Sequence, residues 1–148
     1  MFNPTRILVP TDMSEYSDKA IRRAFDIAKK FNSEVFLLHV IQDAVKQCIA
    51  EYCIDEELFS RLQTQMYEAA RFEIRKQLEK FPYIDPDKVT TDVKTGPPYD
   101  EILKEAEERK IDLIVIACLG TTGLAKYLIG NVARHLLIGA KCSVLLVK

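Results

Sequence analysis

The chain has 148 residues, of which 48% are hydrophobic and 29% are charged, and we expect residues 1–148 to form a single domain. Its 21 basic and 22 acidic side chains leave a formal charge of −1, which disfavours nucleic acid as a partner. The sequence has no stretch of about 18 apolar residues and no secretory signal, so we expect no membrane partner and a cytoplasmic location.

The chain begins with a predicted strand, a helix and a second strand. Residues 6–10 (RILVP) form an apolar run rich in branched residues, which is typical of a strand buried on both faces. Apolar residues then recur every three or four positions, which predicts a helix that Ser14 or Ser17 caps and Asn32 stops. Residues 34–41 (EVFLLHVI) predict the second strand.

Three more helices and three more strands follow. Apolar residues at helical spacing from Leu58 to Phe81 predict a long helix that Pro82 ends. The GPP sequence at 96–98 turns into another helix, and a last helix is predicted over about 131–139. The strand-like runs are residues 88–95, 111–118 and 142–148. The first of these runs is the most polar and fits the edge of a sheet.

The resulting order, βαβαβαβαβ, predicts an α/β fold. Parallel strands need helical crossovers, so we expect a five-stranded parallel sheet with helices on both faces. Open sheets of this kind bind ligands beyond the C-terminal ends of their strands, where the strand order reverses. We therefore expect a site at the residues that follow the first, second and fourth strands.

The segment after the fourth strand is the richest in small residues. Three of the five glycines, Gly120, Gly123 and Gly130, lie in it. A helix beginning at Asn131 would present unpaired N–H groups and a positive dipole end to anionic oxygens, and Asn131 would cap it or donate a side-chain N–H. The alternative is that Gly130 and Asn131 form only a turn and a helix cap.

Asp12 follows the first strand in the sequence Pro10-Thr11-Asp12. A carboxylate repels polyphosphate, so this side chain fits better beside a neutral ribose hydroxyl or an adenine ring. The alternative role for Asp12 is that of a loop or helix-capping aspartate.

No catalytic or metal constellation can be assembled from the sequence. The chain lacks GxxxxGK[ST], a GxGxxG after the first strand and a GxSxG elbow. His39 and His135 lie in apolar periodic runs, which favours packing or flanking roles over roles as bases. The cysteines are Cys48, Cys53, Cys118 and Cys142. Their spacing predicts neither a disulfide framework nor a metal site, and the last two are expected to be packing residues.

Three segments together resemble the universal stress protein family. They are RILVPTDMSEYSDKAIRRAFDIAKKFNSEVFLLHVI, TGPPYDEILKEAEERKIDLIVIACLG and LIGNVARHLLIGAKCSVLLVK. Only residues 42–87 contribute little to the likeness. The resemblance implies a three-layer, Rossmann-like fold of the adenine nucleotide alpha hydrolase-like type, homodimers, and either of two branches, one that binds ATP and one that does not.

The resemblance also implies a binding loop. In the ATP-binding branch a Gly is followed after two residues by a second Gly, and after nine more by Gly and Ser or Thr. The matching positions here are Ala117, Gly120, Gly130 and Asn131, so the spacing holds while the first and last residues depart from the pattern. The methyl group of Ala117 is a small obstruction, and the carboxamide of Asn131 still donates to an oxygen but from a different place.

Further positions match the family's nucleoside contacts. The resemblance places Asp12 beside the nucleoside, the backbone of Val40 beside adenine, and Ile116 at the apolar end of the fourth strand. Pro10 and Thr11 shape the same wall. These contacts converge only if the first and fourth strands are neighbours.

The resemblance implies a regulatory function. We expect a homodimeric switch in stress response that binds ATP or a related adenine nucleotide, with or without Mg²⁺, and acts on a protein partner that the sequence does not identify. One alternative is a nucleotide-independent interaction module that pairs through the C-terminal strand SVLLVK. A slow ATPase is the other alternative, although Lys126 is the only charged residue between Gly120 and Gly130.

Overall fold

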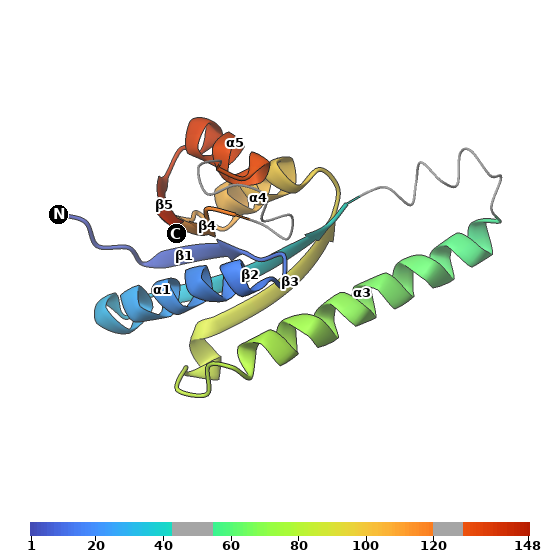
Figure 1. Ribbon diagram of the computed structural model, residues 1–148, viewed down its shortest axis with the longest axis horizontal. Coiled ribbons are helices and arrows are strands. Elements are labelled where there is room, and N and C mark those ends of the chain that lie inside the picture. Colours follow the sequence, from blue (N-terminus) through green and yellow to red (C-terminus); the bar gives the residue numbers. More distant parts are fainter. Residues whose placement is uncertain (43–54, 120–128) are drawn as a thin grey trace.

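The computed structural model describes residues 1–42, 55–119 and 129–148 (Figure 1). In these ranges the strands are β1 (Arg6–Pro10), β2 (Glu34–Ile41), β3 (Val89–Thr95), β4 (Leu113–Ala117) and β5 (Ser143–Val147). The helices are α1 (Glu15–Phe31), α3 (Glu56–Leu78), α4 (Pro98–Glu108) and α5 (Asn131–Gly139), with a 3₁₀ turn at Pro86–Lys88. The predicted alternation of strands and helices is confirmed.

All five strands belong to one parallel sheet with the order β3-β2-β1-β4-β5. The strand order reverses between β1 and β4, which confirms that these two strands are neighbours. The expected position of residues 88–95 near an edge is also confirmed, because β3 is an outermost strand.

The pairing between β1 and β4 is short. It joins Ile7 to Leu113 and Leu8 to Ile114, whereas β1 and β2 are paired from Arg6 to Pro10 along the whole of β1. The C-terminal parts of β1 and β4 are therefore not bonded to each other, and the sheet opens there.

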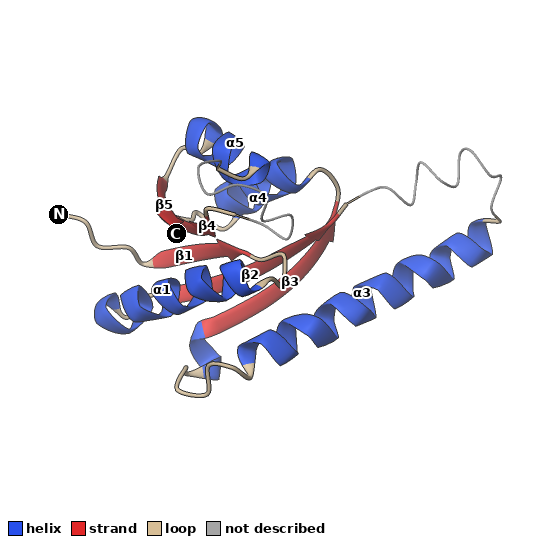
Figure 2. Ribbon diagram, viewed as in Figure 1, coloured by secondary structure: helices blue, strands red, loops and turns tan. Residues whose placement is uncertain are grey.

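Helices cover both faces of the sheet (Figure 2). Ile7 and Val9 pack into one core with residues of α1 and α3, while Leu8 between them points to the opposite core with residues of α4 and α5. This alternation is the two-residue period of a strand, and both faces are apolar because both are covered. The three-layer prediction is confirmed.

The ends of α1 follow the sequence signals. Ser14 is the N-cap, and its hydroxyl oxygen accepts a hydrogen bond from the Ser17 N–H. Asn32 is the C-cap and adopts the left-handed conformation with φ of 56°, which asparagine tolerates better than most residues. Of the two predicted caps, Ser14 is therefore the right one, and Ser17 is buried inside the first turn.

The end predicted for the long helix is wrong. α3 stops at Leu78, four residues before Pro82. Phe81 lies outside the helix, is almost completely buried, and packs edge-on against Phe25 with ring centroids 5.6 Å apart. We attribute the early end of α3 to the burial of this aromatic ring, which requires the chain to leave the helix before Pro82.

Candidate functional site

A cavity of about 590 Å³ lies at the C-terminal ends of β1, β2 and β4, where the sheet opens. Its size is in the range of pockets that hold small organic ligands. The predicted site residues that line it are Pro10, Thr11, Asp12, Val40, Ile116, Ala117, Gly130 and Asn131. The structure thus brings together eight of the nine candidates, and the ninth, Gly120, lies outside the described residues.

The first wall is the corner between β1 and α1. The Thr11 N–H donates to the Leu38 carbonyl at 2.8 Å, and the Thr11 carbonyl lies 2.8 Å from His39 Nδ1, so β2 fixes the corner from two sides. Asp12 Oδ1 accepts a hydrogen bond from the Ser14 N–H at 3.1 Å and another from the Ser14 hydroxyl. Asp12 therefore has the role of a loop aspartate that bonds to its own turn, which was the alternative to a ligand-facing role. It also lines the cavity.

A buried polar network supports this corner from behind. The Thr11 hydroxyl donates to Gln77 Oε1 at 2.8 Å, and Gln77 Nε2 donates to Ser17 Oγ at 3.1 Å and to Asp18 Oδ1 at 2.7 Å. Lys80 then pairs with the other oxygen of Asp18 at 2.7 Å. Thr11, Ser17 and Gln77 are each at most 6% exposed, so these bonds connect α3 to the cavity wall away from solvent.

The second wall is the N-terminus of α5. The first bond within this helix runs from the Arg134 N–H to the Gly130 carbonyl, so the N–H groups of Asn131, Val132 and Ala133 precede the helical ladder. All three residues line the cavity. The aligned peptides of α5 give this end a partial positive charge, which favours anionic oxygens.

The role of Asn131 as a helix cap is wrong. Gly130 is the N-cap, no side chain in the described ranges caps α5, and Asn131 is the first helical residue. Gly130 has φ of −54°, so its backbone does not adopt the left-handed conformation that favours glycine. The absence of a side chain at this position instead leaves the start of α5 open to the cavity.

The remaining wall is apolar. Val40, Ile102 and Ile116 line it, together with Pro98 at the start of α4 and Met66 of α3. One side of the cavity is therefore hydrophobic and the other presents backbone N–H groups. An amphiphilic ligand with a flat apolar part and an anionic part fits this division.

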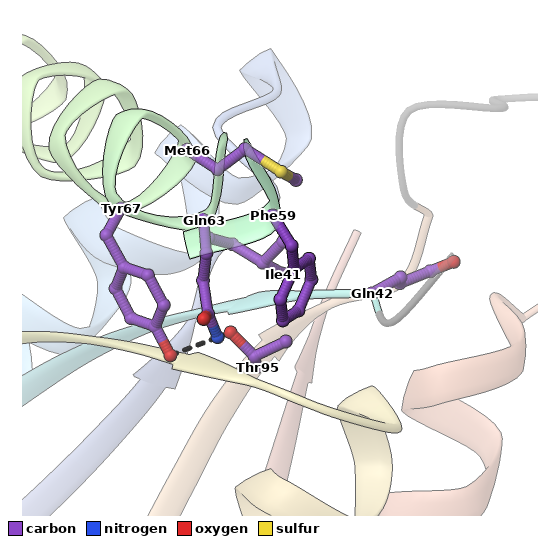
Figure 3. A pocket seen from close by; sticks show the side chains of 7 residues that line it. All are labelled: Ile41, Gln42, Phe59, Gln63, Met66, Tyr67 and Thr95. Carbon is purple, nitrogen blue, oxygen red and sulfur yellow. Dashed lines mark hydrogen bonds between the residues drawn. The ribbon is translucent and has the colours of Figure 1, made fainter. Parts of the chain in front are cut away.

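A smaller cavity of about 20 Å³ lies under α3, and Figure 3 shows its lining. Ile41, Gln42 and Met66 line both this cavity and the larger one. Two of its lining residues are joined by a hydrogen bond that the Thr95 hydroxyl donates to the Tyr67 hydroxyl at 2.7 Å (Figure 3).

Sequence reasoning missed Gln42, Met66 and Gln77, because they lie in the segment 42–87 that contributed little to the resemblance. Gln77 still had a detectable signal. It shares the apolar side of its helix with Ala70 and Ile74, and a polar residue in such a row needs a buried partner.

Three of the remaining candidates, His135, Cys118 and Cys142, lie outside the cavity lining, and Cys142 packs against the core under α4 and α5. His135 is exposed, and its ring stacks on Tyr99 with centroids 4.7 Å apart. Cys118 and Cys142 are free thiols of intermediate exposure, and burial raises the pKa of Cys142. Four further residues, Cys48, Cys53, Gly123 and Lys126, lie outside the described residues.

Within the described ranges, no group of three His, Cys, Asp or Glu side chains is arranged to hold a metal ion. None of the helices in these ranges is long and apolar enough to cross a membrane.

An ion-pair cluster lies under α4, outside the cavity lining. Glu105 is 2% exposed, and Lys94 Nζ lies 2.5 Å from its Oε2 while Arg109 binds its other oxygen. Burial by itself would raise the pKa of Glu105, but the hydrogen bonds from Lys94 and Arg109 outweigh it and hold the pKa below its ordinary value. The bond between Lys94 and Glu105 also raises the pKa of Lys94.

The strand order and the cavity at its reversal define a Rossmann-like α/β protein. The family model of the universal stress protein family matches residues 4–148. The chain belongs to this family, as the sequence resemblance predicted.

The chain is similar to several known members. It is 35% identical over 144 residues to universal stress protein MJ0531 of Methanocaldococcus jannaschii, which covers 97% of this chain and 81% of the relative. It is 30% identical to YxiE of Bacillus subtilis over the whole length of both. Among solved structures, MJ0577 of M. jannaschii matches with a TM-score of 0.83 at 28% identity, covering 99% of this chain and 97% of that one. A universal stress protein in complex with cAMP matches with a TM-score of 0.67 at 20% identity over 99% and 98%, which shows the fold alone.

Proposed function

We propose that this protein binds ATP or a related adenine nucleotide in the cavity between β1 and β4, and that binding makes it a regulatory switch. The observation that carries the proposal is the juxtaposition in one cavity of an open helix N-terminus and an apolar wall. Family membership gives further support, because another universal stress protein is in complex with cAMP.

The lining suggests an orientation for the nucleotide. The phosphates would lie at the N–H groups of Asn131, Val132 and Ala133, where the helix dipole favours negative charge. The base would lie against Val40 and the neighbouring apolar wall. The ribose would then face Asp12, whose carboxylate suits hydroxyl groups better than phosphate.

Binding is a better proposal than hydrolysis. Phosphoryl transfer needs groups that neutralise the transferring phosphoryl and orient a water molecule. Among the described residues that line the cavity there is no Lys or Arg. A ligand that binds one state of the protein more tightly than another is sufficient for a switch.

Calorimetric titration with ATP and Mg²⁺, after removal of any bound ligand, tests this function. We expect the parent to bind and Asp12→Ala combined with Gly130→Val to lose the signal, because the first change removes the ribose partner and the second blocks the start of α5. Asp26→Ala, an exposed change elsewhere on α1, is the matched control and leaves binding unchanged. Ala117→Gly with Asn131→Ser restores the family pattern and keeps or tightens binding.

Absence of heat and of any thermal shift at millimolar ATP contradicts the proposal for the parent. Equal binding by the parent and by the Asp12 and Gly130 double variant places the nucleotide outside this cavity.

We also propose a homodimer through β5. This strand is an edge of the sheet, and the apolar side chains from Val144 to Val147 are only partly buried. An unpaired edge with apolar side chains favours a second strand beside it. Leu145→Glu should convert the dimer to a monomer in light scattering, while Ile138→Glu, a change at an 80% exposed residue of α5, should leave the mass unchanged. Equal masses for the parent and Leu145→Glu would contradict the dimer.

A further inference from the structure

One side of α3 packs on the described part of the protein, and another side carries exposed apolar residues. The buried residues of this helix all lie between Ala70 and Gln77, and Figure 1 shows the helix (green) at the rim of the fold, beside the outermost strand β3. On a different side, Leu58 is 49% exposed, Leu62 is 37% exposed and Phe72 is 62% exposed.

These exposed residues belong to a row with coiled-coil spacing. The row is Leu58, Leu62, Gln65, Ala69 and Phe72, and we name it the α3 seam. Its steps alternate between four and three residues, the spacing that keeps one narrow stripe facing a second helix. Single exposed hydrophobic residues are common, but a stripe of this period over two heptads is suited to helix pairing.

Two oppositely charged residues beside the seam are placed so that two copies of the helix can pair them with each other. Arg61 lies four residues before Gln65, and Glu68 lies three residues after it, on the same flank of the seam. If two copies pack antiparallel about a twofold axis near Gln65, Arg61 of each copy faces Glu68 of the other. A parallel pair would place Arg61 opposite Met66, which lines the cavity of its own chain.

We propose that the α3 seam is an interface with a second copy of this chain, packed antiparallel. Arg61 and Glu57 form an exposed pair at 2.8 Å in the single chain, and both side chains are 72% exposed, so exchange of this pair for an intermolecular one costs little. The seam is roughly 20 Å long at 1.5 Å per residue, which makes the association weak and concentration-dependent. The interface is independent of β5 and of the nucleotide.

A charge-reversal mixing experiment tests the proposal. The Arg61→Glu variant would bring two acidic side chains together at each end of the interface, and the Glu68→Arg variant would bring two basic side chains together there. Each single variant should therefore associate about tenfold more weakly than the parent. An equimolar mixture of the two variants should recover association, because a mixed pair joins two acidic side chains of one copy to two basic side chains of the other.

The measurement is sedimentation equilibrium over a wide range of concentrations, at low and high salt. It is repeated on Leu145→Glu, so that association through β5 does not enter. Circular dichroism of each variant confirms that α3 is retained. A substituted charge that acted only within its own helix would weaken association equally in the mixture. Recovery of association on mixing therefore shows that the two charges meet between copies.

Two results would overturn the interface. The first is a parent mass that is independent of concentration once β5 is blocked. The second is a mixture that associates as weakly as the single variants. Cross-linking supplies the geometry: with a short bismaleimide, Gln65→Cys should give a dimer joined at position 65, while Thr64→Cys, which is exposed but off the seam, should not. Equal cross-linking at both positions would also contradict the antiparallel seam.

Discussion

Replacement of Gln77 by methionine tests the buried network behind the cavity. The change keeps the volume and shape of the side chain but removes one acceptor and one donor group, whose bonds to Thr11, Ser17 and Asp18 measure 2.8, 3.1 and 2.7 Å. The loss is partly compensated, because the Thr11 hydroxyl can turn to Ser17 Oγ at 3.0 Å and Asp18 keeps Lys80. With about 1 kcal/mol for each uncompensated buried bond, we expect the free energy of unfolding to fall by about 2 kcal/mol.

Urea unfolding with linear extrapolation measures this loss, and a thermal melt should show a midpoint lower by about 4 to 8 °C. Gln63→Met is the matched control on the same helix, because Gln63 is only half-buried and lacks the three buried partners of Gln77. We expect the control to stay within about 0.5 kcal/mol of the parent. A Gln77→Met variant as stable as the parent would refute the view that the network holds α3 to the first strand.

Two further predictions concern stability away from the cavity. The folded pKa of Glu105 is below its ordinary value of 4.5, so its contribution to stability is complete above that value and is lost as pH falls through the folded pKa. Urea unfolding at a series of acidic pH values should give a shallower decline for Glu105→Gln than for the parent, and parallel declines would contradict this role. Gly96 has φ of +148°, and a Cβ there would lie 3.0 Å from side-chain atoms of Glu101, so Gly96→Ala should cost about 1 to 2 kcal/mol. Gly139→Ala is its control in thermal unfolding, because a Cβ there would also meet a side chain, Leu103 Cδ1 at 3.2 Å, but without a positive φ. An equal loss in both variants would contradict the role given to backbone conformation.

Most of the fold could be predicted, because the apolar runs and helix-stop residues in the sequence match the segments that the structure buries or ends. Residues 6–10 and 34–41 are continuous apolar runs, and both are strands with those bounds. Asn32 stops α1 through its own backbone preference, which is a local property. The end of α3 could not be predicted, since the burial of Phe81 against Phe25 depends on a contact between segments far apart in the sequence.

The part of the candidate site that is formed by the ends of strands could be predicted from the sequence. Pro10, Val40 and Ile116 meet in the cavity because parallel strands end on the same side of a sheet. The spacing of Gln77 signals that it is buried, but its partners could not be predicted, since they come from α1 and from the corner after β1 and no local pattern reports them. The prediction that α5 begins at Asn131 is confirmed, but the prediction that Asn131 caps this helix is wrong, because Gly130 is the N-cap. Glycine and asparagine are both acceptable at an N-cap, so residue type alone does not distinguish them.

The short pairing between β1 and β4 has a consequence for how this site can change. Only two residue pairs join these strands, so the opening between them is made by the main chain and by strand order. Substitutions in the lining, such as Ala117 and Asn131 where the family motif has other residues, alter the chemistry of the walls without closing the opening. A protein built in this way can exchange one ligand for another through single substitutions, and its scaffold need not be rebuilt at each step.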